Sequence, residues 1–195
     1  ERFLWGDKIS IRDVSIAETR EHLPIGDAKR LTYIPVRDGH TWGRAWGTGW
    51  FRLRFRIPST FKGETVALRF KTGGECIVFR ADVPVQALDH GRDEYILERR
   101  ARGGERVELY VEAGANAAFG GFSKRRMQEP QLMVLNREVW DAYWDLAAVA
   151  GMVDPSEGKL WIGTRVLRAM HPDDTRRARL VYALNRAVDL FDYGN

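Results

Sequence analysis

The sequence predicts a mainly β protein: an antiparallel β-sandwich or jelly roll over residues 1–135, followed by two or three α-helices within residues 136–195. Three observations lead to this fold class. Apolar and polar side chains alternate along several short segments before position 135, glycine-containing turns separate these segments, and the apolar period becomes helical after Asn136. Short alternating strands with no helical period between them are typical of sandwiches and jelly rolls.

The clearest predicted strand covers residues 50–57 and stops before Pro58. Its apolar residues fall on one face and three arginines on the other, because successive side chains of a strand point to opposite faces. We therefore expect a half-buried strand with a solvated basic face. Similar runs occupy residues 66–70, 75–80, 95–97 and 107–112, and the turn signals between runs are Gly73-Gly74, His90-Gly91 and Gly103-Gly104.

The helical part should begin at Asn136, a good N-cap residue, and its first helix should end at Gly151. A second helix is expected from Asp154-Pro155 and a third from Pro172, because proline and acidic residues suit the first turn of a helix. Within the first helix, bulky residues recur every three or four positions and form one aromatic stripe. The stripe consists of Val139, Trp140, Tyr143, Trp144, Ala147 and Ala150.

Composition and charge restrict the class of function. The formal net charge is +4, but the arginines are scattered along the chain and no nucleic-acid-binding motif accompanies them, so we expect solvated surface charge. The single cysteine excludes an intrachain disulfide and favours a reducing compartment. Because there is also no apolar run of membrane-spanning length and no signal-peptide pattern, we expect a cytoplasmic protein that binds neither nucleic acid nor membrane.

The sequence offers no residue set for catalysis or metal binding. His22, His40, His90 and His171 have no metal-ligand spacing, and no phosphate-binding or nucleophile motif is present. Cys76 has no partner of the kind that activates a thiol, and we expect it to be a small core residue. We therefore expect no catalytic residue, no metal ligand and no cofactor in this chain.

Carboxylate pairs are the remaining candidates for chemistry, because glycoside hydrolysis needs only two acids. Asp89, Asp93 and Glu94 are expected in one turn, and Glu75 at the start of a strand. The sequence places no two of them at a defined separation. An autonomous enzyme built on these acids is therefore the weakest hypothesis.

The most informative segment contains three of the seven tryptophans, Trp42, Trp46 and Trp50, separated by glycines. Flat aromatic rings complement the faces of sugar rings, so Trp42 and Trp46 could form a sugar-stacking platform. Alternatively the rings plug one end of the sandwich, and the glycines permit close backbone approach and tight turns. We favour the second interpretation because Trp50 and Phe51 lead directly into a predicted core strand.

This segment also carries a family resemblance. Trp42-Gly43-x-x-Trp46-Gly47-Thr48-x-Trp50-Phe51 resembles the WGxxWGTTWF stretch of glycoside hydrolase family 38 α-mannosidases, in the branch with the yeast vacuolar and animal cytosolic enzymes. The resemblance covers roughly residues 40–192, with departures such as Gly49 where the family usually has Thr and Ala87 where it usually has Gly. It continues in order through residues 74–75, 84–88, 94–97, 104–113, Asn116, 119–120 and 135–146.

The resemblance implies a galactose-binding-like jelly roll that lies before the catalytic domain of a retaining α-mannosidase. The parent enzyme would use a divalent metal, usually zinc, and two carboxylates, but the motifs that hold them do not occur in this sequence. The implied partners are the parent's own catalytic domain and further copies of the parent in a homo-oligomer.

Two principal hypotheses follow. The first is a non-catalytic structural and assembly domain, in which Trp140 and Trp144 bury against the sandwich. The second is a carbohydrate-binding module for mannose-containing oligosaccharides, which requires the rings of Trp42 and Trp46 to be exposed and coplanar.

Overall fold

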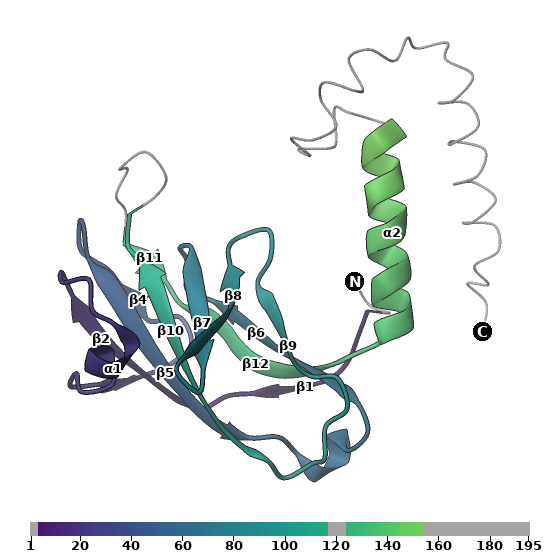
Figure 1. The fold of residues 1–195 in the computed structure, drawn as a ribbon, viewed down its shortest axis with the longest axis horizontal. Helices are drawn as coiled ribbons and strands as arrows, with labels where there is room; N and C mark the ends of the chain where they lie inside the picture. Colours follow the sequence, from purple (N-terminus) through teal and green to yellow (C-terminus); the bar gives the residue numbers. More distant parts are fainter. Residues whose placement is uncertain (1–3, 117–123, 154–195) are drawn as a thin grey trace. The chain divides into compact units, whose positions relative to one another are not determined.

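The computed structural model describes residues 4–116 and 124–153. The chain divides into two compact units, residues 1–136 and 137–195, and each is described by itself. The first unit is formed by antiparallel strands in two principal sheets (Figure 1). The predicted mainly β, antiparallel architecture is confirmed.

The two principal sheets contain four and six strands, and a third, small sheet contains two. The four-stranded sheet has the order β1 (Trp5–Ser10), β12 (Gln128–Leu135), β6 (Thr65–Lys71) and β9 (Glu94–Glu98). The six-stranded sheet has the order β3 (Ile34–Val36), β2 (Asp13–Thr19), β5 (Thr48–Arg56), β10 (Arg106–Gly114), β7 (Cys76–Arg80) and β8 (Val83–Leu88). The small sheet pairs β11 (Arg125–Arg126) with β4 (Thr41–Trp42), and two short helical turns are α1 (Ile25–Ala28) and η1 (Ser59–Phe61).

One hydrophobic core lies between the two principal sheets, as a sandwich requires. Strand β5 shows how the sequence builds it. Phe51 and Leu53 are fully buried and pair with Val111 and Leu109 of β10. Arg54 lies on the opposite face of the same strand and forms an ion pair with Asp13 at 3.1 Å. The predicted half-buried strand with a basic outer face is therefore confirmed.

The second unit begins with α2 (Arg137–Val153). The helix starts directly after Asn136, as predicted, and an ion pair between Arg137 and Asp141 at 2.8 Å spans its first turn. The expected end at Gly151 is wrong, because the helix continues through Val153. A single glycine costs a helix only about 1 kcal/mol and does not terminate it alone.

The second and third predicted helices, from Asp154 and Pro172, lie outside the described residues. The expected burial of Trp140 and Trp144 against the sandwich stays a prediction. Within the described residues, no helix is long and apolar enough to span a membrane.

Candidate functional site: a groove at the loop edge of the sandwich

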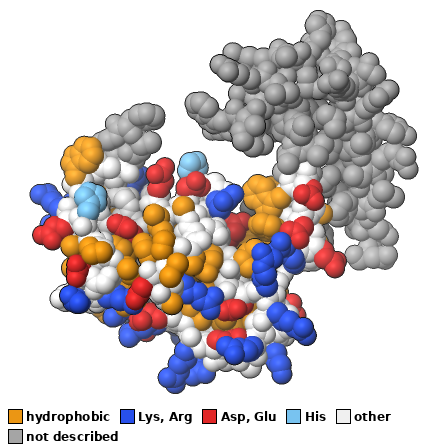
Figure 2. All heavy atoms as spheres, in the orientation of Figure 1, with side chains coloured by type: hydrophobic (Ala, Val, Ile, Leu, Met, Phe, Trp, Pro, Cys, Tyr) orange, Lys and Arg blue, Asp and Glu red, His pale blue; other side chains and the backbone are white. Residues whose placement is uncertain are grey.

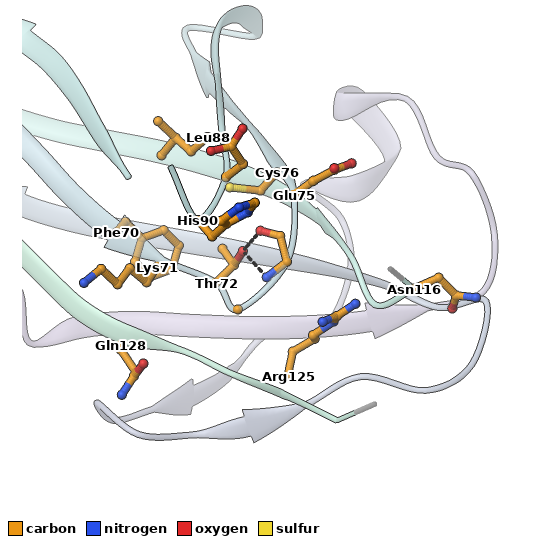
Figure 3. Close-up of a pocket in the computed structure, with 13 residues that line it drawn as sticks. Phe70, Lys71, Thr72, Glu75, Cys76, Leu88, His90, Asn116, Arg125 and Gln128 are labelled. Carbon is orange, nitrogen blue, oxygen red and sulfur yellow. Dashed lines mark hydrogen bonds between the residues drawn. The ribbon is translucent and has the colours of Figure 1, made fainter. Parts of the chain in front are cut away.

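A groove of about 620 Å³ lies at the edge of the sandwich where several turns meet (Figure 3). It takes residues from the β6–β7 turn, the β8–β9 turn, the end of β10 and strands β11 and β12. A second cavity of about 520 Å³ adjoins it and continues toward Ile77 and Ala87. The two cavities share Glu75, Cys76, Leu88, Asp89 and Asn116.

The β6–β7 turn closes one side of this groove because two glycines let it approach its neighbours. Gly73 has a φ of +86°, and a Cβ there would lie 2.8 Å from the backbone N and O of Arg126. A Cβ on Gly74 would lie 2.5 Å from the carbonyl oxygen of Gly114. The hydroxyl of Thr72 donates a hydrogen bond to the carbonyl oxygen of Gly74 at 2.7 Å, which fixes the turn. Any side chain at Gly73 or Gly74 would therefore displace the strands that border the groove.

Two charged residues of the lining are anchored by hydrogen bonds to the backbone. Nε of Arg125 donates to the carbonyl oxygen of Ala115 at 2.8 Å. Oδ1 of Asp89 accepts from the backbone N–H groups of Gly91 and Arg92 at 2.7 and 2.8 Å. Asp89 thus builds the β8–β9 turn, as aspartate commonly does. Both side chains keep polar atoms at the groove while their positions are fixed.

A network of ion pairs borders the groove beside Lys71. Nζ of Lys71 lies 3.2 Å from Asp93 and 3.1 Å from Glu129, and Nε of Arg69 lies 3.3 Å from Asp93. The backbone N–H of Asp93 donates to the carboxylate of Glu94 at 3.2 Å. The network therefore joins β6, β12 and the start of β9 at one end of the four-stranded sheet.

The two neighbouring acids of this network differ in pKa. Burial, the hydrogen bond with Asp93 and the charge of Asp93 raise the pKa of Glu94 to about 7. Burial opposes ionisation of Asp93 as well, but the hydrogen bond with Glu94 and the charges of Arg69 and Lys71 hold its pKa below the ordinary value. Of the two acids, Glu94 is therefore the one that keeps its proton up to near neutral pH, while Asp93 is ionised.

The four carboxylates singled out in the sequence lie in three different surroundings. Asp93 and Glu94 are hydrogen-bonded to each other, whereas glycoside hydrolysis needs two acids roughly 5–10 Å apart on either side of the bond. Asp89 holds a turn, and Glu75 is exposed at the groove. The arrangement supports structural roles for Asp89 and Asp93.

Metal and thiol chemistry find no support in the described part of the chain. Residues 4–116 and 124–153 contain no group of three or more His, Cys, Asp or Glu side chains that could hold a metal ion. These residues therefore do not fit a zinc site. Cys76 lies in the core, as predicted, and burial raises the pKa of its thiol to about 11. A thiol with that pKa is protonated at neutral pH and is a poor nucleophile.

The tryptophan-rich segment is divided between the core and the surface. Trp42 is only 2% exposed, its ring meets Phe51 edge to face at 5.3 Å, and its Nε1 donates to the carbonyl oxygen of Thr72 at 2.8 Å. Trp50 is fully buried beside Ala28 and Tyr110. The expectation that the rings belong to the sandwich core holds for Trp42, whereas Trp50 lies in a separate buried cluster on the other face of β5.

Trp46 has the opposite environment. It is 74% exposed and has a φ of +59°, and its backbone N–H donates to Oδ1 of Asn116 at 2.6 Å. Because Trp42 is buried, the two rings do not form the coplanar, exposed platform that the carbohydrate-binding hypothesis required. A sugar contact at Trp46 stays a prediction.

Comparison with known families decides the assignment of the fold. A model of the family described as "Alpha-mannosidase, jelly roll domain" matches residues 9–146. The chain belongs to this family. The resemblance found in the sequence is thereby confirmed, and the sandwich is an α-mannosidase jelly roll domain.

Three similar proteins are named alpha-mannosidases. The chain is 27% identical to mouse alpha-mannosidase 2C1 over 204 residues, which cover 97% of this chain and 18% of that protein. It is 24% identical to alpha-mannosidase G of Dictyostelium discoideum, over 89% of this chain and 18% of that protein. It is 26% identical to the alpha-mannosidase of Saccharomyces cerevisiae, over 83% of this chain and 15% of that protein. The α-mannosidase jelly roll domain thus spans less than a fifth of the length of these relatives.

Among solved structures, the β-glucuronidase from Ruminococcus gnavus aligns with a TM-score of 0.46 and 12% sequence identity. The alignment covers 66% of this chain and 28% of that chain.

The packing of Trp42 places a restriction on Gly49. A Cβ at Gly49 would lie 2.6 Å from Cζ3 of the Trp42 ring. With the ring in this position, only glycine fits at position 49.

The polar residues of the groove, Asn116, Arg125 and Gln128, were not predicted as a site from the sequence. The only sequence signal near them is the Gly73-Gly74 pair, which is also an ordinary turn signal.

Proposed function

We propose that this chain is the non-catalytic N-terminal structural and assembly domain of a glycoside hydrolase family 38 α-mannosidase that acts in the cytoplasm. In this proposal the parent enzyme hydrolyses α-mannosides with retention, and any zinc is held in a separate catalytic domain. The partners of the jelly roll domain are that catalytic domain and other copies of the parent. The family match over residues 9–146 is the observation that carries the proposal.

The absence of a catalytic set among the described residues agrees with this role. The acids singled out in the sequence hold a turn or take part in an ion-pair network, and the described residues offer no metal-binding group. The relatives named alpha-mannosidase are more than five times as long as the segment that they share with this chain. Hydrolysis of mannosides is therefore assigned to residues outside this chain.

An exposed apolar patch supports an assembly role. Ile77 and Val85 are each 40% exposed and Val83 is 58% exposed, on the two adjacent strands β7 and β8. Figure 2 shows apolar side chains gathered near the centre of the face on which these strands lie. Strand β8 is also an edge strand of the six-stranded sheet. Contiguous apolar patches of this kind are typical of interaction surfaces.

The assignment is tested first by the gene that encodes the chain. We expect its reading frame to continue beyond Asn195 into a domain with a histidine-containing metal motif and an aspartate nucleophile. A reading frame that closes within a few codons of Asn195 would contradict the proposal, because no catalytic domain would then exist.

The assembly role is tested in the whole gene product by the double substitution Ile77→Asp and Val85→Asp. We expect the double variant to sediment as a smaller species than the wild type, since two charges would enter an apolar contact. The matched control is Ile34→Asp, which adds a charge at an exposed apolar position, 54% exposed, on the opposite edge strand of the same sheet. Unchanged sedimentation of the double variant, or an equal change in the control, would remove the patch from the assembly surface.

A further inference from the structure

The larger cavity of the groove takes none of its lining from the apolar patch that is proposed above as an assembly surface. The two adjoining cavities, of about 620 and 520 Å³, share five lining residues and form one continuous depression. Their volumes lie within the range of small-molecule sites, about 300–1,000 Å³ each. The depression therefore has the volume for a ligand of more than one ring.

The charges that line the larger cavity balance one another. Two cations, Lys71 and Arg125, face two anions, Glu75 and Asp89. A site for a polyanion would show an excess of positive charge, which this lining does not. Hydrogen-bonding side chains that can take part without a net charge are Thr72, His90, Asn116 and Gln128.

The same cavity also has apolar residues among its lining. Phe70 and Leu88 belong to the core and line the cavity from within the sandwich. Figure 3 shows the labelled polar residues Asn116, Arg125 and Gln128 coming from segments other than the one that carries His90. A ligand here would meet apolar contacts and separate hydrogen-bond donors and acceptors. Sugars present this combination, because their hydroxyl groups both donate and accept while their ring faces are apolar.

Trp46 supplies the aromatic surface for such a ligand. Its side chain gains little from burial, being 74% exposed, and its left-handed backbone conformation is costly for a bulky residue. Its backbone is nevertheless held in place, because its N–H donates to Asn116 and the N–H of Gly47 donates to the carbonyl oxygen of Arg44 at 2.9 Å. Asn116 itself lines both cavities. The ring of Trp46 is therefore exposed on a backbone that is bonded to Asn116, a residue of the groove lining, and such a ring contributes little to folding.

We propose that the groove binds a neutral oligosaccharide, with Trp46 stacking against one sugar ring at the rim and Glu75, Gln128 and the Arg125 guanidinium bonding to hydroxyl groups. The proposal does not rest on the catalytic assignment of the parent. The carbohydrate-binding hypothesis from the sequence used the rings of both Trp42 and Trp46. The present proposal uses the ring of Trp46 and the polar groove.

The test is a fluorescence and calorimetric titration of the 195-residue chain with an α-linked mannotriose and, separately, with cellotriose, each up to about 10 mM, since weak sugar binding corresponds to millimolar Kd. We expect saturable binding of at least one trisaccharide. Trp46→Ala should weaken it about tenfold, because the variant loses the aromatic ring on which the sugar stacks. Glu75→Ala, at an exposed residue, should weaken it by a smaller factor and serves as the second variant if Trp46→Ala does not fold.

The matched control is Trp144→Ala, which removes another exposed tryptophan, 42% exposed, that belongs to α2 and is not among the lining residues of either cavity. Its binding should equal that of the wild type. Absence of saturable binding for both trisaccharides, or equal affinity in wild type and both groove variants, would overturn the proposal. Competition by a sulfated polysaccharide fragment at lower concentration than either sugar would also overturn it, because it would identify a polyanion site. Because no turnover is measured, failure of this site leaves the mannosidase assignment unaffected.

Discussion

The interior of the sandwich and its loop edge use the same residue type in opposite ways, four positions apart. Trp42 lies inside, edge to face with Phe51, and its one polar atom is bonded to Thr72. Trp46 lies at the edge, where the backbone is fixed and the ring is exposed. The difference shows that an aromatic segment cannot be assigned to core or site as a whole. Whether each ring is buried or exposed depends on the contacts that its backbone position allows.

The same contrast applies to polar groups. In the core, Nε1 of Trp42 is bonded to the backbone of Thr72, whereas the edge gathers ion pairs, anchored turns and the acid pair of Asp93 and Glu94. Removing an interior group should therefore reduce stability, whereas removing an edge group should mainly alter binding or pH dependence.

The largest effect is expected from Trp42→Ala. Loss of this buried ring should lower the free energy of unfolding by about 3–5 kcal/mol, as for other large-to-small aromatic substitutions. Trp46→Ala should change it by no more than about 0.5 kcal/mol, because the ring is exposed. Urea unfolding followed by circular dichroism measures both. Equal losses of unfolding free energy in the two variants would contradict the distinction between a buried Trp42 and an exposed Trp46.

A smaller effect is expected at the glycine that faces Trp42. Gly49→Ala would place a Cβ 2.6 Å from the ring and should cost about 1–3 kcal/mol through overpacking. Gly26→Ala is the matched control, since no atom lies within 4 Å of its Cβ position and Gly26 is in the helical turn α1. That control should be neutral or slightly stabilising. A neutral Gly49→Ala would mean that the ring can move aside.

The smallest effect is a dependence on pH at the edge. The pKa of Glu94 is about 7 in the folded protein, above the value of about 4.3 for an unfolded chain. Between these two values the folded state binds more protons than the unfolded state, so the free energy of unfolding should fall as pH rises from 5 to 8. Unfolding in urea at the two pH values measures the change.

Glu94→Gln sharpens this measurement because glutamine resembles the protonated acid. The variant should be more stable than the wild type at pH 8 and similar to it at pH 5. A wild type that loses no more stability than the variant between pH 5 and pH 8 would show that Glu94 titrates normally.

Much of the fold could be predicted from the sequence, because strand alternation is a local property. The run over residues 50–57 lies in β5 as expected, apart from its last residue, and the helix after Asn136 begins where its N-cap signal lies. The small sheet of β4 and β11 was not predicted, because two-residue strands have no period to detect. The helix end was misplaced because a glycine only weakens a helix.

The candidate site was much harder to predict. Its residues come from turns that are far apart in the chain, and Asn116, Arg125 and Gln128 have no spacing that marks them. The roles of Trp42 and Trp46 could not be separated because a glycine follows each of them in the sequence. The contact of the Trp42 ring with Phe51 of β5 and the left-handed turn at Trp46 distinguish the two residues.

The central claim is that this jelly roll domain belongs to an α-mannosidase and does not perform its chemistry. The most direct test compares hydrolysis of a chromogenic α-mannoside by the 195-residue chain and by the whole product of its gene, each with and without added zinc. We predict release of the chromophore by the whole product and none above background by the 195-residue chain. Zinc-dependent turnover by the purified 195-residue chain would contradict the account.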